Sequence, residues 1–160
     1  MQEIIDKDFL RLVDILEREF SYQDSLLALL SKEQAAITKI RHDELESIVN
    51  QKQDLLNEVS EVAKDRMKLL TSMAHTIAEQ TKVMPSLRIS DLLEYCSDKN
   101  KKEKMLQLVE VVRKGAENVH QMNSRNNELL NYTMGLVSTT LNMVTNTSQT
   151  ELPVYGQSGA

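Results

Sequence analysis

No glycine and no proline precede Pro85 in this chain, so the first half carries no strong interruption of regular backbone. Such a stretch favours long, continuous helices, because glycine and proline are the residues that most often end them. Aromatic residues make up only 4% of the chain and tryptophan is absent, which argues against a β-sandwich or an aromatic-lined pocket. We therefore predict an all-α fold.

Residues 3–41 are predicted to form the first helix, because their apolar positions alternate in steps of three and four. Phe20 and Leu27 widen the apolar face, as a helix packed against two neighbours requires. Glu19, Gln23 and Glu33 fall on the same stripe, so the seam is not wholly apolar. The apolar stripe consists of Ile5, Phe9, Leu12, Leu16, Leu26, Leu30, Ile37 and Ile40.

A break near His42 is followed by a second helix, which Asp43 is predicted to cap with Glu46 three residues later. Two cations interrupt its stripe, Lys52 and Arg66, two heptads apart. Glu19 and Glu33 of the first helix are the expected partners, and such pairs would set the register of an antiparallel pair of helices. The second stripe is Leu45, Ile48, Lys52, Leu55, Val59, Val62, Arg66, Leu69, Met73 and Ile77.

The second half contains the clearest internal loop, residues 83–89 around Pro85. A short helix is predicted from Ser90 or Asp91 to about Ser97, and a last long helix covers residues 101–145. Gly115 and Gly135 weaken this helix and indicate a bend or a close approach to another helix.

The predicted architecture is an elongated antiparallel bundle of three long helices plus one short helix. The bundle covers residues 1–145. Residues 146–160 are rich in Thr, Ser, Gln, Gly and Pro and are predicted to form a flexible, disordered tail.

The sequence gives no pattern for catalysis, so we predict no enzyme activity, no metal and no cofactor. Gly-rich phosphate-binding loops are absent, and the one Glu-x-x-His pair, Glu117 with His120, lacks the second pair that a di-metal bundle needs. The net charge of −5 argues against nucleic acid as a partner. A single cysteine, Cys96, and the lack of a leader or a long apolar run lead us to expect a cytoplasmic protein without stable membrane insertion.

Two features of the last part of the chain are unusual for a bundle helix. Residues 123–130 place the amides of Asn123 and Asn126 on or beside the apolar stripe, where they need partners or cost stability. The chain then closes with Tyr155-Gly156-Gln157-Ser158-Gly159, whose one aromatic side chain suits a short recognition peptide.

In their order, these features resemble the FlgN family of flagellar type III export chaperones. The family pattern has Asn-x-x-Asn-x-x-Leu-Leu on the last helix, a tail Tyr-Gly-x-x-Gly and an earlier Lys-x-x-Leu-Leu. The matching residues are Asn123, Asn126, Leu129 and Leu130, then Tyr155, Gly156 and Gly159, and earlier Lys52, Leu55 and Leu56.

The resemblance implies a cytoplasmic chaperone that binds the C-terminal segment of hook–filament junction proteins (FlgK and FlgL types) and delivers them to the export gate protein FlhA. It also implies that Tyr155, Gly156 and Gly159 dock at the gate. The last helix independently carries more apolar surface near its end than one seam needs, which suits helix-in-groove binding. The candidate client-binding residues are Asn123, Asn126, Leu129, Leu130, Met134, Val137, Leu141 and Val144.

Two alternatives remain at this level. The late apolar residues of the last helix can simply pack within the bundle. A different class of function is a structural coiled coil that self-assembles without a client, and this would require a seam continuous from Asp43 to Thr145. The loop at Pro85 argues against such a seam.

Overall fold

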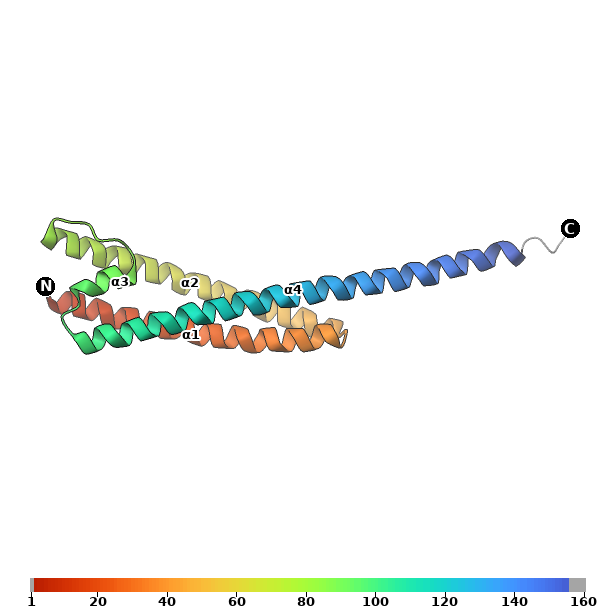
Figure 1. Ribbon diagram of the computed structural model, residues 1–160, viewed down its shortest axis with the longest axis horizontal. Helices are drawn as coiled ribbons and strands as arrows, with labels where there is room; N and C mark the ends of the chain where they lie inside the picture. The colour runs from red at the N-terminus through yellow and green to blue at the C-terminus, as the bar shows by residue number, and fades with distance from the viewer. Residues whose placement is uncertain (1, 156–160) are drawn as a thin grey trace.

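The computed structural model describes the backbone of residues 2–155 and the side chains of residues 5–145. It confirms an all-α fold, and the described residues contain no β-strand. The three long helices lie along the longest axis of the molecule as an elongated bundle, with α2 running opposite to α1 and α4 (Figure 1). The elements are α1 (Gln2–Thr38), α2 (His42–Thr81), α3 (Ile89–Leu92), the 3₁₀ turn η1 (Leu93–Tyr95) and α4 (Lys99–Tyr155).

Helix α1 is the central member of the bundle. Both α2 and α4 pack along it, α2 antiparallel and α4 parallel (Figure 1). The chain reverses between α2 and α4 through the predicted loop, where Lys82 ends α2 in a left-handed conformation. Because of this reversal, residues 43–145 do not form the continuous seam that the self-assembling coiled coil required.

The core is widest at the end of the bundle where α3 lies, because α3 and η1 add apolar side chains to the three long helices. Leu92 and Leu93 are almost completely buried. Burial of each such side chain contributes about 2 kcal/mol. The buried residues of this cluster are Ile5, Phe9, Leu12, Leu16, Leu70, Met73, Ala74, Ile77, Leu92, Leu93, Met105 and Val112.

The α1–α2 turn differs from its prediction. Helix α1 ends at Thr38, and Arg41 N–H donates to the carbonyl of Ala36 while Ile40 N–H donates to that of Ile37. This is the Schellman pattern, and it places Ile40 at the left-handed position that usually holds glycine, with φ 53°. Ile40 therefore leaves the predicted seam and is 61% exposed.

Two further expectations are corrected. Asp43 is not the cap of α2, because the helix already begins at His42, with Arg41 before it and no side-chain bond at the cap. Arg41 instead pairs with Glu44 at 3.1 Å. Phe20 does not widen the packed face of α1: it is 44% exposed, since α2 and α4 cover other sides of the helix.

Helix α4 is much longer than its neighbours. Asp98 begins it by accepting hydrogen bonds from the backbone N–H groups of Asn100 and Lys101 at 2.9 and 3.2 Å. Its 57 residues span about 85 Å, against about 55 Å for the 37 residues of α1. One end of α4 therefore projects past the α1–α2 turn (Figure 1).

The predicted end of the last helix, at Thr145, falls inside α4, whose backbone continues to Tyr155. No glycine or proline occurs between Gly135 and Pro153, so no residue there forces the helix to end. The separate character of residues 146–160 stays a prediction, and residues 156–160 lie outside the described part of the chain.

Candidate functional site

A polar cluster joins all three long helices near the α1–α2 turn. Lys52 Nζ of α2 donates to both carboxylate oxygens of Glu33 on α1, at 2.9 and 3.1 Å, and to Asn123 Oδ1 of α4 at 3.0 Å. Asn126 Nδ2 donates to Glu33 Oε2 and to the carbonyl of Leu30, both at 2.8 Å. Asn126 is only 2% exposed. The cluster fixes how far α4 is shifted along α1 and α2.

The second ion pair of the bundle lies farther from the turn. Arg66 of α2 meets the buried carboxylate of Glu19 on α1 at 2.5 Å. Burial raises the pKa of Glu19 above its usual value, against the opposing attraction of Arg66. The predicted partnership of Lys52 and Arg66 with Glu33 and Glu19 is thus confirmed, and both pairs join the same two antiparallel helices.

Gly115 lets α4 approach α1 closely. Gln23 Nε2 of α1 donates to the carbonyl of Val112 at 3.0 Å, and a Cβ on Gly115 would lie 2.1 Å from Gln23 Oε1. The close approach predicted from this glycine is confirmed. At Gly135 a Cβ would meet nothing within 4 Å, so this glycine marks no close approach.

The apolar face of α4 continues past the end of its neighbours. Leu129 and Leu130 are half-buried at the last level of the bundle. Beyond them we call residues 134–145 the overhang, because these are the described side chains of α4 at and past the level of the α1–α2 turn. Its large apolar residues are exposed by 42 to 65%: Met134, Leu136, Val137, Leu141, Met143 and Val144. The alternative that these residues pack within the bundle is therefore wrong.

A groove lies where the overhang leaves the bundle, with a volume of about 380 Å³. The α1–α2 turn supplies one wall and α4 the other. We call it the turn groove. Its turn wall is made of Ile37, Ile40, His42 and Leu45, and its α4 wall of Leu130, Thr133, Met134, Val137, Ser138, Leu141 and Asn142.

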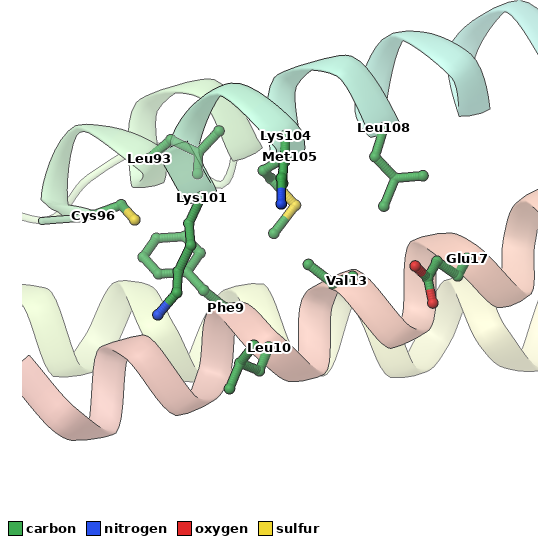
Figure 2. A pocket seen from close by; sticks show the side chains of 10 residues that line it. All are labelled: Phe9, Leu10, Val13, Glu17, Leu93, Cys96, Lys101, Lys104, Met105 and Leu108. Atoms are coloured by element: carbon green, nitrogen blue, oxygen red, sulfur yellow. The ribbon is translucent and has the colours of Figure 1, made fainter. Parts of the chain in front are cut away.

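A second hollow of about 390 Å³ lies at the opposite end of the bundle, between α1 and the start of α4 (Figure 2). Its floor is the core itself, with Phe9, Leu93 and Met105 almost fully buried. Lys101 lies toward one end of it and Glu17 at the other, with Lys104 and Met105 between them in this view (Figure 2). This hollow lies over packed core side chains, whereas the turn groove opens onto the exposed apolar side chains of the overhang.

The remaining candidate groups are not brought together. Glu117 is exposed and accepts a hydrogen bond from Arg113, and His120 is exposed beside it. Among the described side chains, no group of three or more His, Cys, Asp and Glu residues is placed to hold a metal ion. Within residues 2–155, no helix has both the length and the apolar character that a bilayer span requires.

The sequence reasoning missed two parts of this site. Ile40 was assigned to a packed seam and instead forms a wall of the turn groove. The second missed feature is the lack of charge along the end of α4. Residues 129–150 contain no Asp, Glu, Lys, Arg or His, although charged residues make up 27% of the chain. A helix without charges over that length is suited to contacts that do not depend on charge.

In a comparison with known families, the family described as FlgN protein matches residues 2–160, which is almost the whole chain. Neither the curated proteins nor the solved structures gave a match.

Proposed function

Since the chain belongs to the FlgN family and is thus a flagellar export chaperone, we propose that it binds the C-terminal segment of hook–filament junction proteins of the FlgK and FlgL types. Binding keeps these clients unassembled in the cytoplasm, and the complex is then delivered to the export gate protein FlhA. The family is one of chaperones rather than enzymes.

The observation that carries the client proposal is the exposed apolar face of the overhang. Scattered exposed apolar residues are ordinary, but a contiguous row along one helix marks a surface for a protein partner. Leu130, Met134, Val137 and Leu141 follow one another in steps of four, three and four. They therefore share one side of α4, as a surface that receives a client helix requires.

The candidate client-binding residues divide into two groups by their surroundings. Met134, Val137, Leu141 and Val144 are exposed and are proposed to contact the client, with Leu129 and Leu130 at the edge of the bundle. Asn126 is buried against α1 and Asn123 pairs with Lys52. These two amides are proposed to act by holding α4 in the register that leaves the overhang uncovered.

Gate docking is proposed for Tyr155, Gly156 and Gly159. Tyr155 is the last residue of α4, about 20 Å along the helix axis from Leu141 at 1.5 Å per residue. Gly156 and Gly159 lie outside the described residues. The separation between Tyr155 and the overhang would let one chain hold a client and the gate at the same time.

Titration calorimetry against both partners tests this division. Leu141→Asp puts a charge into the apolar contact, so we expect at least about tenfold weaker binding of the junction-protein C-terminal segment and unchanged binding of the gate protein. Tyr155→Ala should do the reverse. The part of α4 before the overhang packs along α1, and we call it the covered part. Leu106→Asp is the matched control, because Leu106 lies in the covered part but on the side of α4 that is exposed.

Two outcomes contradict the proposal. If the wild-type chain forms no complex with the junction-protein segment in calorimetry or size-exclusion chromatography, the client assignment is wrong. If Tyr155→Ala abolishes client binding as strongly as Leu141→Asp does, the two partners do not use separate parts of α4.

A further inference from the structure

The α1–α2 turn contains Ile40, whose backbone conformation and side-chain exposure both fail to stabilise the isolated chain. Ile40 has φ 53° at the C′ position of the Schellman turn, where a β-branched side chain is strained and glycine or asparagine is favoured. Its side chain is also 61% exposed. A strained residue that buries little of its apolar surface within the chain suggests a role outside it.

The place of Ile40 indicates that role. Its side chain lines the turn groove together with Leu45, opposite Val137 and Leu141 of the overhang. Both walls are therefore mainly apolar, with His42 on the turn wall and Asn142 on the α4 wall among the polar members, and the α4 wall is the surface proposed to contact the client. Ile40 lies beside that surface rather than elsewhere on the molecule.

The face of α4 that lines the turn groove indicates what kind of partner surface fits there. At about 100° per residue, the buried residues Met105, Val112 and Asn126 lie within about 60° of one another around α4, and Val137 and Leu141 fall in the same sector. In the covered part, this sector packs against a helix, α1. The same face continues into the overhang past the end of α1, so the surface that fits there is another helix.

We propose that the turn groove holds an amphipathic helix of the client, end to end with α1, and that Ile40 is a specificity-determining contact at the junction. This inference rests on the proposed client binding and adds a second wall to it. The occupant is recognised on the α4 wall by apolar side chains in helical spacing, because residues 129–150 of this chain carry no charge.

The test uses Ile40→Asn in the full chain, with the same junction-protein segment as probe. Asparagine tolerates the left-handed conformation, so the variant should keep or raise the Tm, by up to about 3 °C. Loss of the apolar contact should weaken client binding about tenfold. Stability and affinity are thus expected to change in opposite directions, which a merely structural residue would not do.

Val49→Asn is the matched control. Val49 is an exposed apolar residue of α2 at 53%, close in sequence to the turn but not in the groove, so its substitution should leave client affinity unchanged. Ile40→Leu should retain most of the affinity, because it keeps the apolar contact.

Three results would overturn the inference. If Leu141→Asp weakens client binding and Ile40→Asn does not, the client uses α4 alone and the proposed function stands without the second wall. If Ile40→Asn lowers both Tm and affinity, Ile40 is structural. If light scattering shows a dimer of the chain that Ile40→Asn dissociates, the groove holds a second copy rather than a client.

Discussion

The covered part of α4 and the overhang carry the same pattern of apolar residues in opposite surroundings. Met105 and Val112 are buried against α1 and its neighbours, whereas Val137 and Leu141, on the same side of the helix, are exposed. The spacing of apolar residues determines which face of a helix is available for packing against a partner. The difference in length between α4 and α1 determines whether that partner belongs to the same chain.

The two parts also differ in their polar chemistry. The covered part meets α1 and α2 through a buried carboxylate, a lysine and two amides, whose directional hydrogen bonds favour a single register. The overhang has no charge to impose such a register. The covered part is therefore specified for its fixed neighbours in the same chain, and we propose that the overhang receives clients of differing sequence.

Truncating one methionine in each part should show the contrast most strongly. Met105 is 2% exposed and Met134 is 62% exposed. Met105→Ala leaves a cavity in the core and should lower the free energy of unfolding by about 3 kcal/mol, whereas Met134→Ala should change it by less than about 0.5 kcal/mol. Urea unfolding followed by circular dichroism measures both. Equal losses would mean that the overhang is packed in solution.

Lys52 tests whether the covered part depends on its buried polar cluster. Lys52→Met leaves the carboxylate of Glu33 buried without its cation and should cost about 3 kcal/mol of stability. Replacing Glu33 by Leu in the same chain should recover most of that loss. Lys64→Met is the control, because the Lys64–Glu61 pair is exposed and should give no measurable change. If both lysine variants behave alike, the cluster does not fix the register.

Sequence periodicity predicted most of the packing within the bundle, because each long helix there buries one face. The stripe of α2 lies on its packed side from Leu45 to Ile77, and the two carboxylates of the α1 stripe meet the two cations of the α2 stripe as expected. Both results depend on the helical period alone, which a single sequence displays.

The errors occur where the answer depends on where helices end and on which sides of a helix its neighbours cover. Ile40 has the period of the α1 seam, but the helix ends before it and the Schellman bonds place it in the turn. Phe20 fits a wide apolar face, but α2 and α4 leave its side of α1 open. The exposure of the overhang also required the register of α4 on α1, which single-helix patterns do not contain. The roles of the late apolar residues and of Tyr155 stay predictions.

The two glycines of α4 give a smaller and opposite pair of effects. Gly115→Ala forces Gln23 away and breaks its hydrogen bond to Val112, which should outweigh the gain in helix propensity and cost about 1 kcal/mol. The Cβ of Gly135→Ala would meet no atom within 4 Å, so this substitution should stabilise the helix by about 1 kcal/mol. The helix content of the overhang should therefore rise. Thermal unfolding followed at 222 nm tests both, and a stabilising Gly115→Ala would contradict the close contact.

The smallest effect distinguishes the buried carboxylate of Glu19 on α1 from the exposed carboxylate of Glu110 on α4. Burial raises the pKa of Glu19 in the folded chain, while the hydrogen bond from Arg113 lowers the pKa of the exposed Glu110. A carboxylate with a raised folded pKa favours the folded state below its unfolded pKa and loses that contribution as pH rises through the folded value. The stability of the wild type relative to Glu19→Gln should therefore fall between pH 4 and pH 7. Relative to Glu110→Gln, the stability of the wild type should rise over the same range, because a lowered pKa reverses the sign.

Denaturant unfolding of the three proteins at pH 4, 5, 6 and 7 measures both differences. If the two differences had the same sign, the carboxylate of Glu19 would be hydrated rather than enclosed between α1 and α2, and the contrast between a covered and an open part of the molecule would weaken at that level of the bundle.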